Sequence, residues 1–154
     1  MKNLAALAAL VVCASANAYD VTSEVNYGDH DEIQMRVGPR FALSPHWSID
    51  TGVSVISFKD FTDSVEMIDA TIQHRNFFGR NYVDFGTGLA LWTAKNWDVQ
   101  RSGTQWTFSN RLGFGRKLAN GAEVGIVWRH YSNLAFSPNT CKDFGGIHVS
   151  FPVN

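Results

Sequence analysis

After residue 18, apolar and polar residues alternate along segments of about ten residues, a length typical of membrane barrel strands. Gly, Pro, Asn and Asp separate these segments. A period of two predicts β-strands, because successive side chains of a strand point to opposite faces of the sheet. No later apolar run approaches the roughly eighteen residues that a membrane-spanning helix needs. The pattern predicts eight strands: Val21–Tyr27, Ile33–Phe41, Trp47–Phe58, Val65–His74, Asn81–Thr93, Thr104–Arg116, Glu123–Ser132 and Asp143–Phe151.

Each predicted strand has one apolar face and one polar face. The polar faces together carry charges of both signs, on Glu24, Asp50, Asp69, Asp84, Glu123, Arg36, Arg40, Arg111 and Arg129. In a membrane barrel these side chains would line the lumen, because each Arg at the lipid midplane would cost roughly 2–4 kcal/mol. The sequence therefore predicts an all-β fold, an eight-stranded antiparallel transmembrane β-barrel with an up-and-down meander.

A water-soluble barrel or sandwich, including a soluble periplasmic lipid-binding barrel, would give a similar pattern with the apolar faces turned inward. Large rings at the ends of the apolar faces favour the membrane barrel, since they resemble the aromatic girdles at the bilayer interfaces; they belong to Phe41, Trp47, Trp106 and Phe151. The even-numbered connections are short and include the hairpin signal Asn120-Gly121. Residues 94–103 and 133–142 form longer connections, which we expect on the external side.

The first eighteen residues have the pattern of an export signal. Lys2 supplies the positive start, residues 4–14 an apolar run, and Ala16-Asn17-Ala18 a cleavage site. We therefore expect a cleaved signal peptide (residues 1–18), one barrel domain (residues 19–154), and a place in the outer membrane of a Gram-negative bacterium. A lipoprotein signal at Cys13 is a weaker alternative, because the residue before that cysteine is not small.

Charge and ligand spacing exclude other classes of partner. The formal net charge is −1, which gives no reason to expect a nucleic acid partner. His30, His46, His74 and His148 lie on separate segments without metal-ligand spacing, so neither a metal nor another cofactor is expected. The sequence predicts contact with membrane lipid and leaves a homodimer open.

Two polar residues continue an apolar face at the end of the segment Glu123–Ser132. His130 and Ser132 follow Trp128 with the same parity, and two residues along a strand lie roughly 7 Å apart and point the same way. A polar pair gains nothing structural on a lipid-facing wall, so the pair favours a nucleophile and its base. Asp143 begins the neighbouring antiparallel strand on the same face and can approach His130.

This arrangement predicts a Ser-His-Asp triad for acyl transfer. Ser132 would attack an ester carbonyl, His130 would move the proton, and Asp143 would orient the imidazole. An oxyanion also needs hydrogen-bond donors. Asn133 directly follows the nucleophile, and Asn139 lies in the same connection, so both are candidate donors.

The same region resembles the PagL family of lipid A 3-O-deacylases. The resemblance rests on Arg129-His130-Tyr131-Ser132-Asn133, on Pro138-Asn139 followed by an acidic residue, and on upstream motifs at Asn110–Gly115, Ala119–Gly121 and Val124-Gly125. It covers roughly the C-terminal half of the chain. It implies an outer-membrane esterase that removes the 3-linked hydroxyacyl chain of lipid A or lipopolysaccharide in the outer leaflet, without a metal.

By position, His130 and Ser132 match the base and nucleophile of this family, and Asn133 and Asn139 match its asparagines near the oxyanion. The sequence departs from the family at Asp143, where the family has glutamate, and at Ala135, where it often has glycine. These departures keep open a non-catalytic structural or adhesive outer-membrane barrel. Cationic residues in the predicted outer loops are candidates for holding substrate phosphates: Lys59, Lys95, Arg101 and Lys142.

Overall fold

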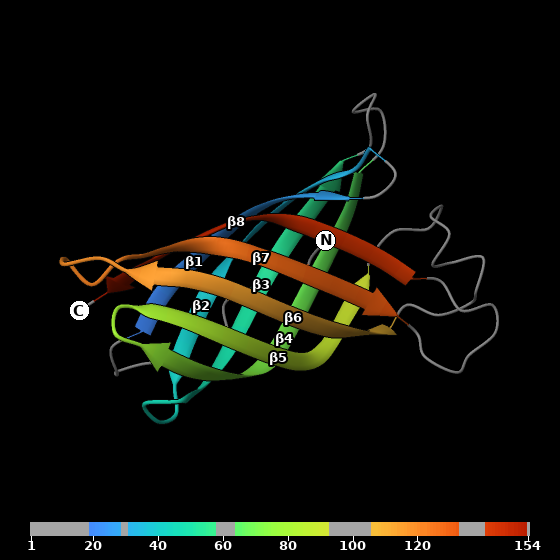
Figure 1. Cartoon of the computed structure of the whole chain (residues 1–154). Coiled ribbons are helices and arrows are strands. Elements are labelled where there is room, and N and C mark those ends of the chain that lie inside the picture. Colours follow the sequence, from blue (N-terminus) through green and yellow to red (C-terminus); the bar gives the residue numbers. More distant parts are fainter. Residues whose placement is uncertain (1–18, 29–30, 58–63, 93–105, 133–140, 154) are drawn as a thin grey trace.

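The computed structural model describes residues 19–28, 31–57, 64–92, 106–132 and 141–153. These residues form eight strands: β1 (Tyr19–Gly28), β2 (Ile33–Ala42), β3 (Trp47–Ser57), β4 (Ser64–Phe78), β5 (Asn81–Trp92), β6 (Trp106–Lys117), β7 (Glu123–Ser132) and β8 (Cys141–Val153). Each strand pairs antiparallel with the next, and β8 pairs with β1, so the sheet closes into a barrel (Figure 1). The predicted eight-stranded up-and-down barrel is confirmed. No helix within the described ranges is long and apolar enough to cross a membrane.

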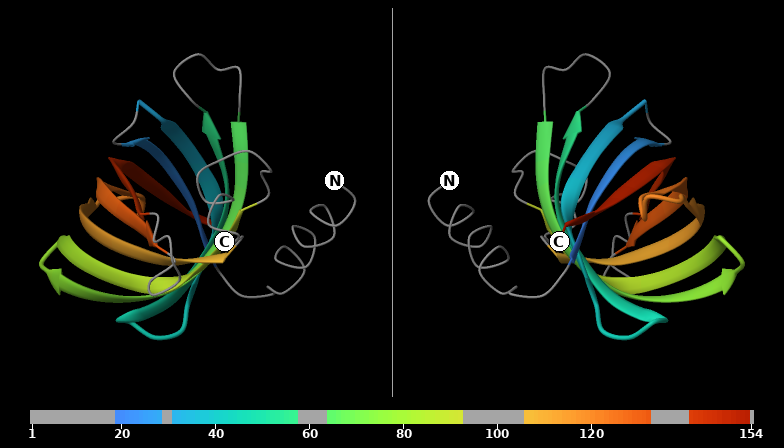
Figure 2. Two further views of the ribbon diagram at one scale, coloured as in Figure 1. Left: turned by 90° about the vertical axis from the view of Figure 1, so that its right-hand side faces the viewer. Right: turned by 90° about the vertical axis from the view of Figure 1, so that its left-hand side faces the viewer.

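The apolar faces of the strands form the outer wall. Val25, Ile126 and Ile147 are 57%, 64% and 61% exposed, whereas Arg111 and Arg129 are at most 1% exposed. The strands curve around a central interior (Figure 2). Polar and charged side chains fill that interior. Eight strands enclose a space that is just wide enough for such side chains. This arrangement excludes the alternative in which the apolar faces point inward.

Ion pairs between distant strands fill the interior. Arg36 Nη2 donates to Asp69 Oδ1 at 2.7 Å and to Asp50 Oδ1 at 2.9 Å. Arg129 Nε donates to Glu24 Oε2 at 2.6 Å. All of these side chains are buried and have lost their contact with water. An opposite charge and a hydrogen bond compensate each of them for that loss. The predicted distribution of charges on the inner face is confirmed.

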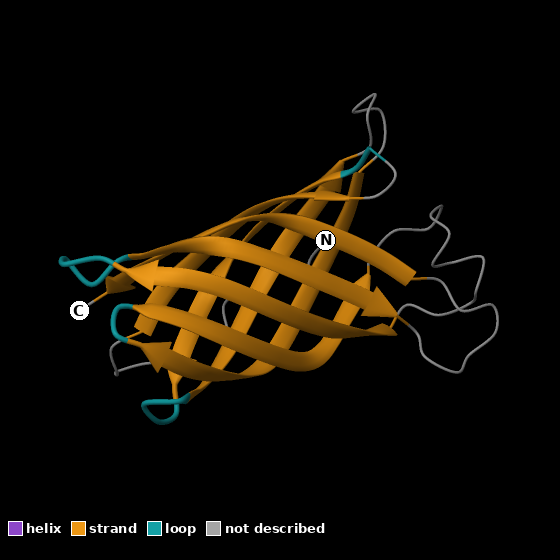
Figure 3. Ribbon diagram, in the orientation of Figure 1, coloured by secondary structure: helices purple, strands orange, loops and turns teal. Residues whose placement is uncertain are grey.

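Short turns join β2 to β3, β4 to β5 and β6 to β7 at one end of the barrel (Figure 3). The Asn120-Gly121 signal is confirmed there: Gly121 has a φ of 86°, and the Leu118 N–H donates to the Ala122 carbonyl at 2.7 Å. A positive φ is readily adopted by glycine, which lets the chain reverse within a few residues.

Strands β4 and β8 extend furthest beyond the ranges that their sequence patterns predicted. β4 continues past His74 to Phe78, because Arg75 points inward and pairs with Asp84 and Glu123. The short connection expected between His74 and Asn81 is therefore present but shorter than predicted, since only Gly79 and Arg80 separate β4 from β5. The charge of Arg75 suggested a loop in the sequence. In the structure its side chain forms ion pairs inside the barrel, so the alternation of inward and outward side chains continues through it.

β8 begins at Cys141, two residues before the predicted start, which moves Lys142 out of the expected loop. The Lys142 side chain points into the barrel, is buried, and donates from Nζ to Glu32 Oε1 at 2.5 Å. The expectation that Lys142 holds a substrate phosphate is therefore wrong, because its ammonium is already paired inside. Lys59, Lys95, Arg101 and the predicted signal peptide at residues 1–18 lie outside the described residues.

Candidate active site

His130 and Asp143 face each other across the β7–β8 pair on the outer wall. The register aligns the two residues, and His130 Nδ1 lies 3.0 Å from Asp143 Oδ1. A carboxylate only accepts hydrogen bonds, so this contact places the imidazole proton on Nδ1 and leaves Nε2 as an acceptor. The Trp128 ring stacks on His130 with centroids 5.6 Å apart and limits rotation of the imidazole. His130 is thus held in the orientation and tautomer that a general base needs.

Ser132 ends β7, two residues beyond His130 and with the same parity. The register sets it between Phe108 on β6 and Cys141 on β8. Ser132 is only 5% exposed, which is less than its outward position predicted. The hydrogen bonds of the described residues include none between Ser132 and His130. Hydroxyl–imidazole contacts of this kind are often long in a protein without substrate and shorten when substrate binds.

Two further polar side chains lie at the same level of the outer wall. Asn110 on β6 is directly opposite His130, and Thr87 on β5 is directly opposite Asn110. Thr87 Oγ1 donates to Asn110 Oδ1 at 3.0 Å. Together with Asp143, these residues form a polar row that crosses four strands. Thr87 and Asn110 could have been noticed in the sequence, since each is a polar residue on the otherwise apolar face of its strand. That they lie side by side with His130 follows only from the register of the strands.

A hollow of about 340 Å³ lies next to this row, on the side toward the middle of the barrel wall. Its lining comes from β5, β6 and β7: Val83, Leu112, Gly113, Phe114, Ile126, Val127 and Trp128. Leu112 follows Asn110 on the same face, and Trp128 precedes His130. A chain that enters the hollow from the polar row therefore meets apolar side chains at once.

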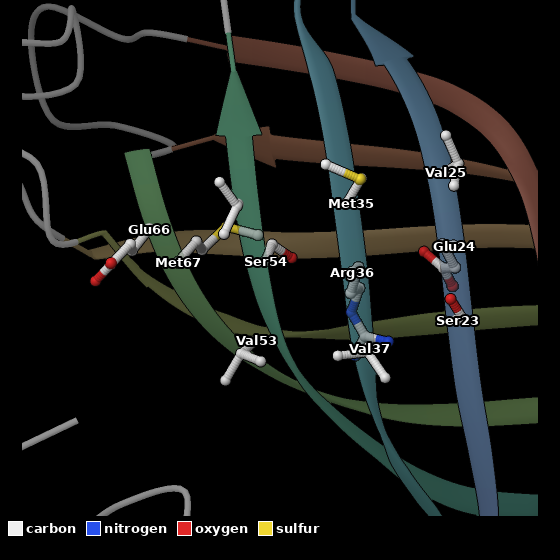
Figure 4. Close-up of a pocket in the computed structure, with 11 residues that line it drawn as sticks. Ser23, Glu24, Val25, Met35, Arg36, Val37, Val53, Ser54, Glu66 and Met67 are labelled. Atoms are coloured by element: carbon white, nitrogen blue, oxygen red, sulfur yellow. The ribbon is translucent and has the colours of Figure 1, made fainter. Parts of the chain in front are cut away.

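A second hollow of about 550 Å³ lies on β1–β4 (Figure 4). Exposed apolar side chains such as Val25, Met35 and Val53 line it. Of the predicted site residues, those that the structure describes lie on β7 and β8 and take no part in this lining. The hollow beside the polar row is therefore the one that continues from His130.

Asn133 and Asn139, the predicted oxyanion donors, lie outside the described residues. Cys141 is exposed at the start of β8. Within the described part of the chain, no group of three or more His, Cys, Asp or Glu side chains is arranged to hold a metal ion.

The fold is that of a membrane-type β-barrel, and its outer wall carries a polar row that includes a His–Asp pair. A family model described as Lipid A 3-O-deacylase (PagL) matches residues 34–152. The chain therefore belongs to the PagL family.

A curated relative supports this assignment. It is the lipid A deacylase PagL of Pseudomonas aeruginosa, which is 30% identical to this chain over 73 residues. The match covers 47% of this chain and 42% of the relative, so it spans less than half of that protein's length.

Solved structures share the barrel architecture. The crystal structure of the outer membrane enzyme PagL superposes with a TM-score of 0.74, at 19% identity, over 87% of this chain and 99% of its own. The N-terminal β-barrel domain of Pseudomonas aeruginosa OprF superposes with a TM-score of 0.61, at 13% identity, over 89% of this chain and 98% of its own. At these identities the likeness concerns the fold alone, and the site is argued from its own residues.

Proposed function

We propose that this protein is a lipid A 3-O-deacylase of a Gram-negative outer membrane, a serine esterase that hydrolyses the 3-linked hydroxyacyl ester of lipid A in the outer leaflet. The observation that carries the proposal is the His130–Asp143 contact on the outer wall, in a chain of this family. A site on the outer wall meets a lipid substrate directly, because the substrate lies in the same leaflet as the strand ends. No metal or other cofactor takes part in the proposed chemistry.

In the proposed reaction, Ser132 Oγ bonds to the ester carbonyl carbon while His130 Nε2 takes its proton. The carbonyl electrons move to the oxygen and then return as the bond to the sugar 3-oxygen breaks. His130 gives its proton to that leaving oxygen. A water molecule, activated in the same way, then hydrolyses the acyl-Ser132 ester and releases a 3-hydroxy fatty acid. Asp143 accepts the Nδ1–H throughout and stabilises the imidazolium.

The negative oxygen of each tetrahedral intermediate needs donors. We assign this role to Asn133, through its backbone N–H or side-chain amide, and to Asn139. The released acyl chain would lie in the apolar hollow on β5–β7, which begins beside His130 and runs into the apolar wall. The burial of hydrocarbon there would hold the ester carbonyl near Ser132 and orient it.

Purified full-length protein should release 3-hydroxy fatty acid from lipopolysaccharide, as measured by mass spectrometry of the lipid A product. Replacement of the nucleophile, Ser132→Ala, should lower the rate by at least about a thousandfold, because alanine has no hydroxyl to attack the ester. The matched control is Ser23→Ala, an outward serine on β1 that should retain the wild-type rate. Equal inactivity of wild type and Ser132→Ala on intact barrels would instead support the non-catalytic structural or adhesive barrel.

A further inference from the structure

Thr87 and Asn110 interrupt an otherwise apolar stretch of the outer wall. Their outward neighbours along the same strands are apolar and exposed, including Phe85, Leu89 and Leu112. A polar side chain that faces hydrocarbon without a partner loses hydrogen bonds with water, so such positions are costly and tend to be functional. Both residues lie at the level of His130, and neither belongs to the proposed triad.

The hydrogen bond between the two residues orients the Asn110 amide. Thr87 Oγ1 donates to Asn110 Oδ1 at 3.0 Å, which engages the amide oxygen and leaves the Nδ2 hydrogens available to another acceptor. The hydrogen bonds found among the described strands include none from Asn110 Nδ2. Asn110 therefore presents a donor on the wall, directly across the β6–β7 pair from His130.

The polar row and the hollow follow one another in a fixed order. Beyond Asn110 the same face of β6 continues with Leu112 and Phe114, and beyond His130 the same face of β7 continues with Trp128 and Ile126; all four line the hollow. An acyl chain whose carbonyl lies at His130 and whose tail lies in the hollow thus passes beside Asn110.

From this order we propose that Asn110, oriented by Thr87, is a specificity-determining residue that donates a hydrogen bond from Nδ2 to the 3-hydroxyl of the scissile acyl chain. The inference rests on the proposed esterase function. That hydroxyl is two carbons from the ester carbonyl, and neighbouring strands are about 4.8 Å apart, so a carbonyl held over β7 places the hydroxyl over β6. Esters with a 3-hydroxyl would then be preferred to esters that lack it.

Two synthetic substrates of equal chain length test the proposal, the p-nitrophenyl esters of 3-hydroxydecanoate and decanoate, with full-length protein in detergent micelles. Wild type should favour the hydroxylated ester about tenfold in kcat/KM, the effect of one hydrogen bond. In Asn110→Leu this ratio should fall toward one. Thr87→Val, which keeps the size of the side chain but removes the hydroxyl, should also lower the ratio, whereas Thr87→Ser, which keeps the hydroxyl, should retain the wild-type ratio.

Thr51→Val is the matched control, because Thr51 is an outward threonine on β3, and its ratio should equal that of wild type. A structural role of Asn110 would lower both rates together and leave the ratio unchanged, which would overturn the inference while the esterase function stands. Absence of any Ser132-dependent hydrolysis by wild type, on these esters and on lipopolysaccharide, would overturn the proposed function and the inference with it. A gel shift on heating verifies that each variant forms a closed barrel.

Discussion

Asp143 decides which nitrogen of His130 carries the proton. The carboxylate lies 3.0 Å from Nδ1, so Nε2 is left to accept a proton from Ser132. Asp143→Asn keeps the size of the side chain but offers an amide donor that favours the other tautomer. We expect kcat for lipid A deacylation to fall by about 10²–10⁴-fold with little change in KM.

Asp143→Glu is the informative companion variant, since glutamate keeps the charge and is the residue that the PagL resemblance implies at this position. It should retain much more activity than Asp143→Asn in the same assay. If Asp143→Asn deacylates lipid A at the wild-type rate, Asp143 does not orient His130 and the triad has to be redrawn.

For single residues, the sequence could predict which face of a strand a side chain occupies, because the alternation along the strand determines it. His130 and Asp143 share the outer face because each continues an apolar alternation, and the β7–β8 hairpin brings them together. Thr87 and Asn110 could not be joined to them in the same way, because their alignment depends on the register of two further strand pairs. The placement of Lys142 in an outer loop was wrong for a related reason, since its inner partner Glu32 lies 110 residues away in sequence.

The hollow that we propose for the acyl chain crosses three strands, β5, β6 and β7. Val83→Phe adds a ring to its lining and should displace the far end of a long acyl chain. Each methylene left outside an apolar site loses about 0.8 kcal/mol, so the loss of two methylenes should lower kcat/KM about tenfold for long chains and less for short ones. A series of 3-hydroxyacyl esters of increasing length measures the shift.

Val53→Phe is the matched control, because Val53 is an outward valine that lines the other hollow, on β1–β4. Its chain-length preference should equal that of wild type. A shift of the same size in both variants would mean that the added ring acts through general contact with lipid or detergent, and the β5–β7 hollow would lose its assigned role.

The alternation of apolar and polar residues predicted how many strands the barrel has, their order, and which face of each strand points outward. It did not predict where each strand ends. The expected end of β4 at His74 was wrong because Arg75, which looks like a loop residue, completes ion pairs with Asp84 and Glu123. The Arg75–Asp84 pair lies within the β4–β5 hairpin, but the Arg75–Glu123 pair joins β4 to β7, which are not neighbours in the sheet and meet across the interior only when the barrel has closed. Strand ends therefore depend on the finished barrel, whereas the centres of strands are set by local alternation.

The barrel as a whole places its polar interior and its candidate chemistry on opposite sides of one wall. Arg129 and His130 are neighbours on β7, yet the first is buried among interior carboxylates and the second faces outward. A period of two makes this separation unavoidable. It also means that interior substitutions test stability, while outer-wall substitutions test function, as long as the closed sheet persists.

Glu24 offers the clearest test of how much the interior ion pairs contribute to the stability of the barrel. Its carboxylate is buried and accepts hydrogen bonds from Arg129 at 2.6 Å and from Arg111 at 3.4 Å. Glu24→Gln would leave part of this buried positive charge unpaired, and loss of one partner of a buried ion pair costs about 3–5 kcal/mol. We expect unfolding at clearly lower urea concentration, measured by loss of the heat-dependent gel shift in lipid vesicles.

Ser23→Ala is the matched control, because Ser23 is next to Glu24 in sequence but points outward. Its free energy of unfolding should lie within about 0.5 kcal/mol of the wild-type value. If the two variants unfold at the same urea concentration, the ion pairs of the interior contribute little to barrel stability, and burial of the apolar outer wall in lipid supplies it instead.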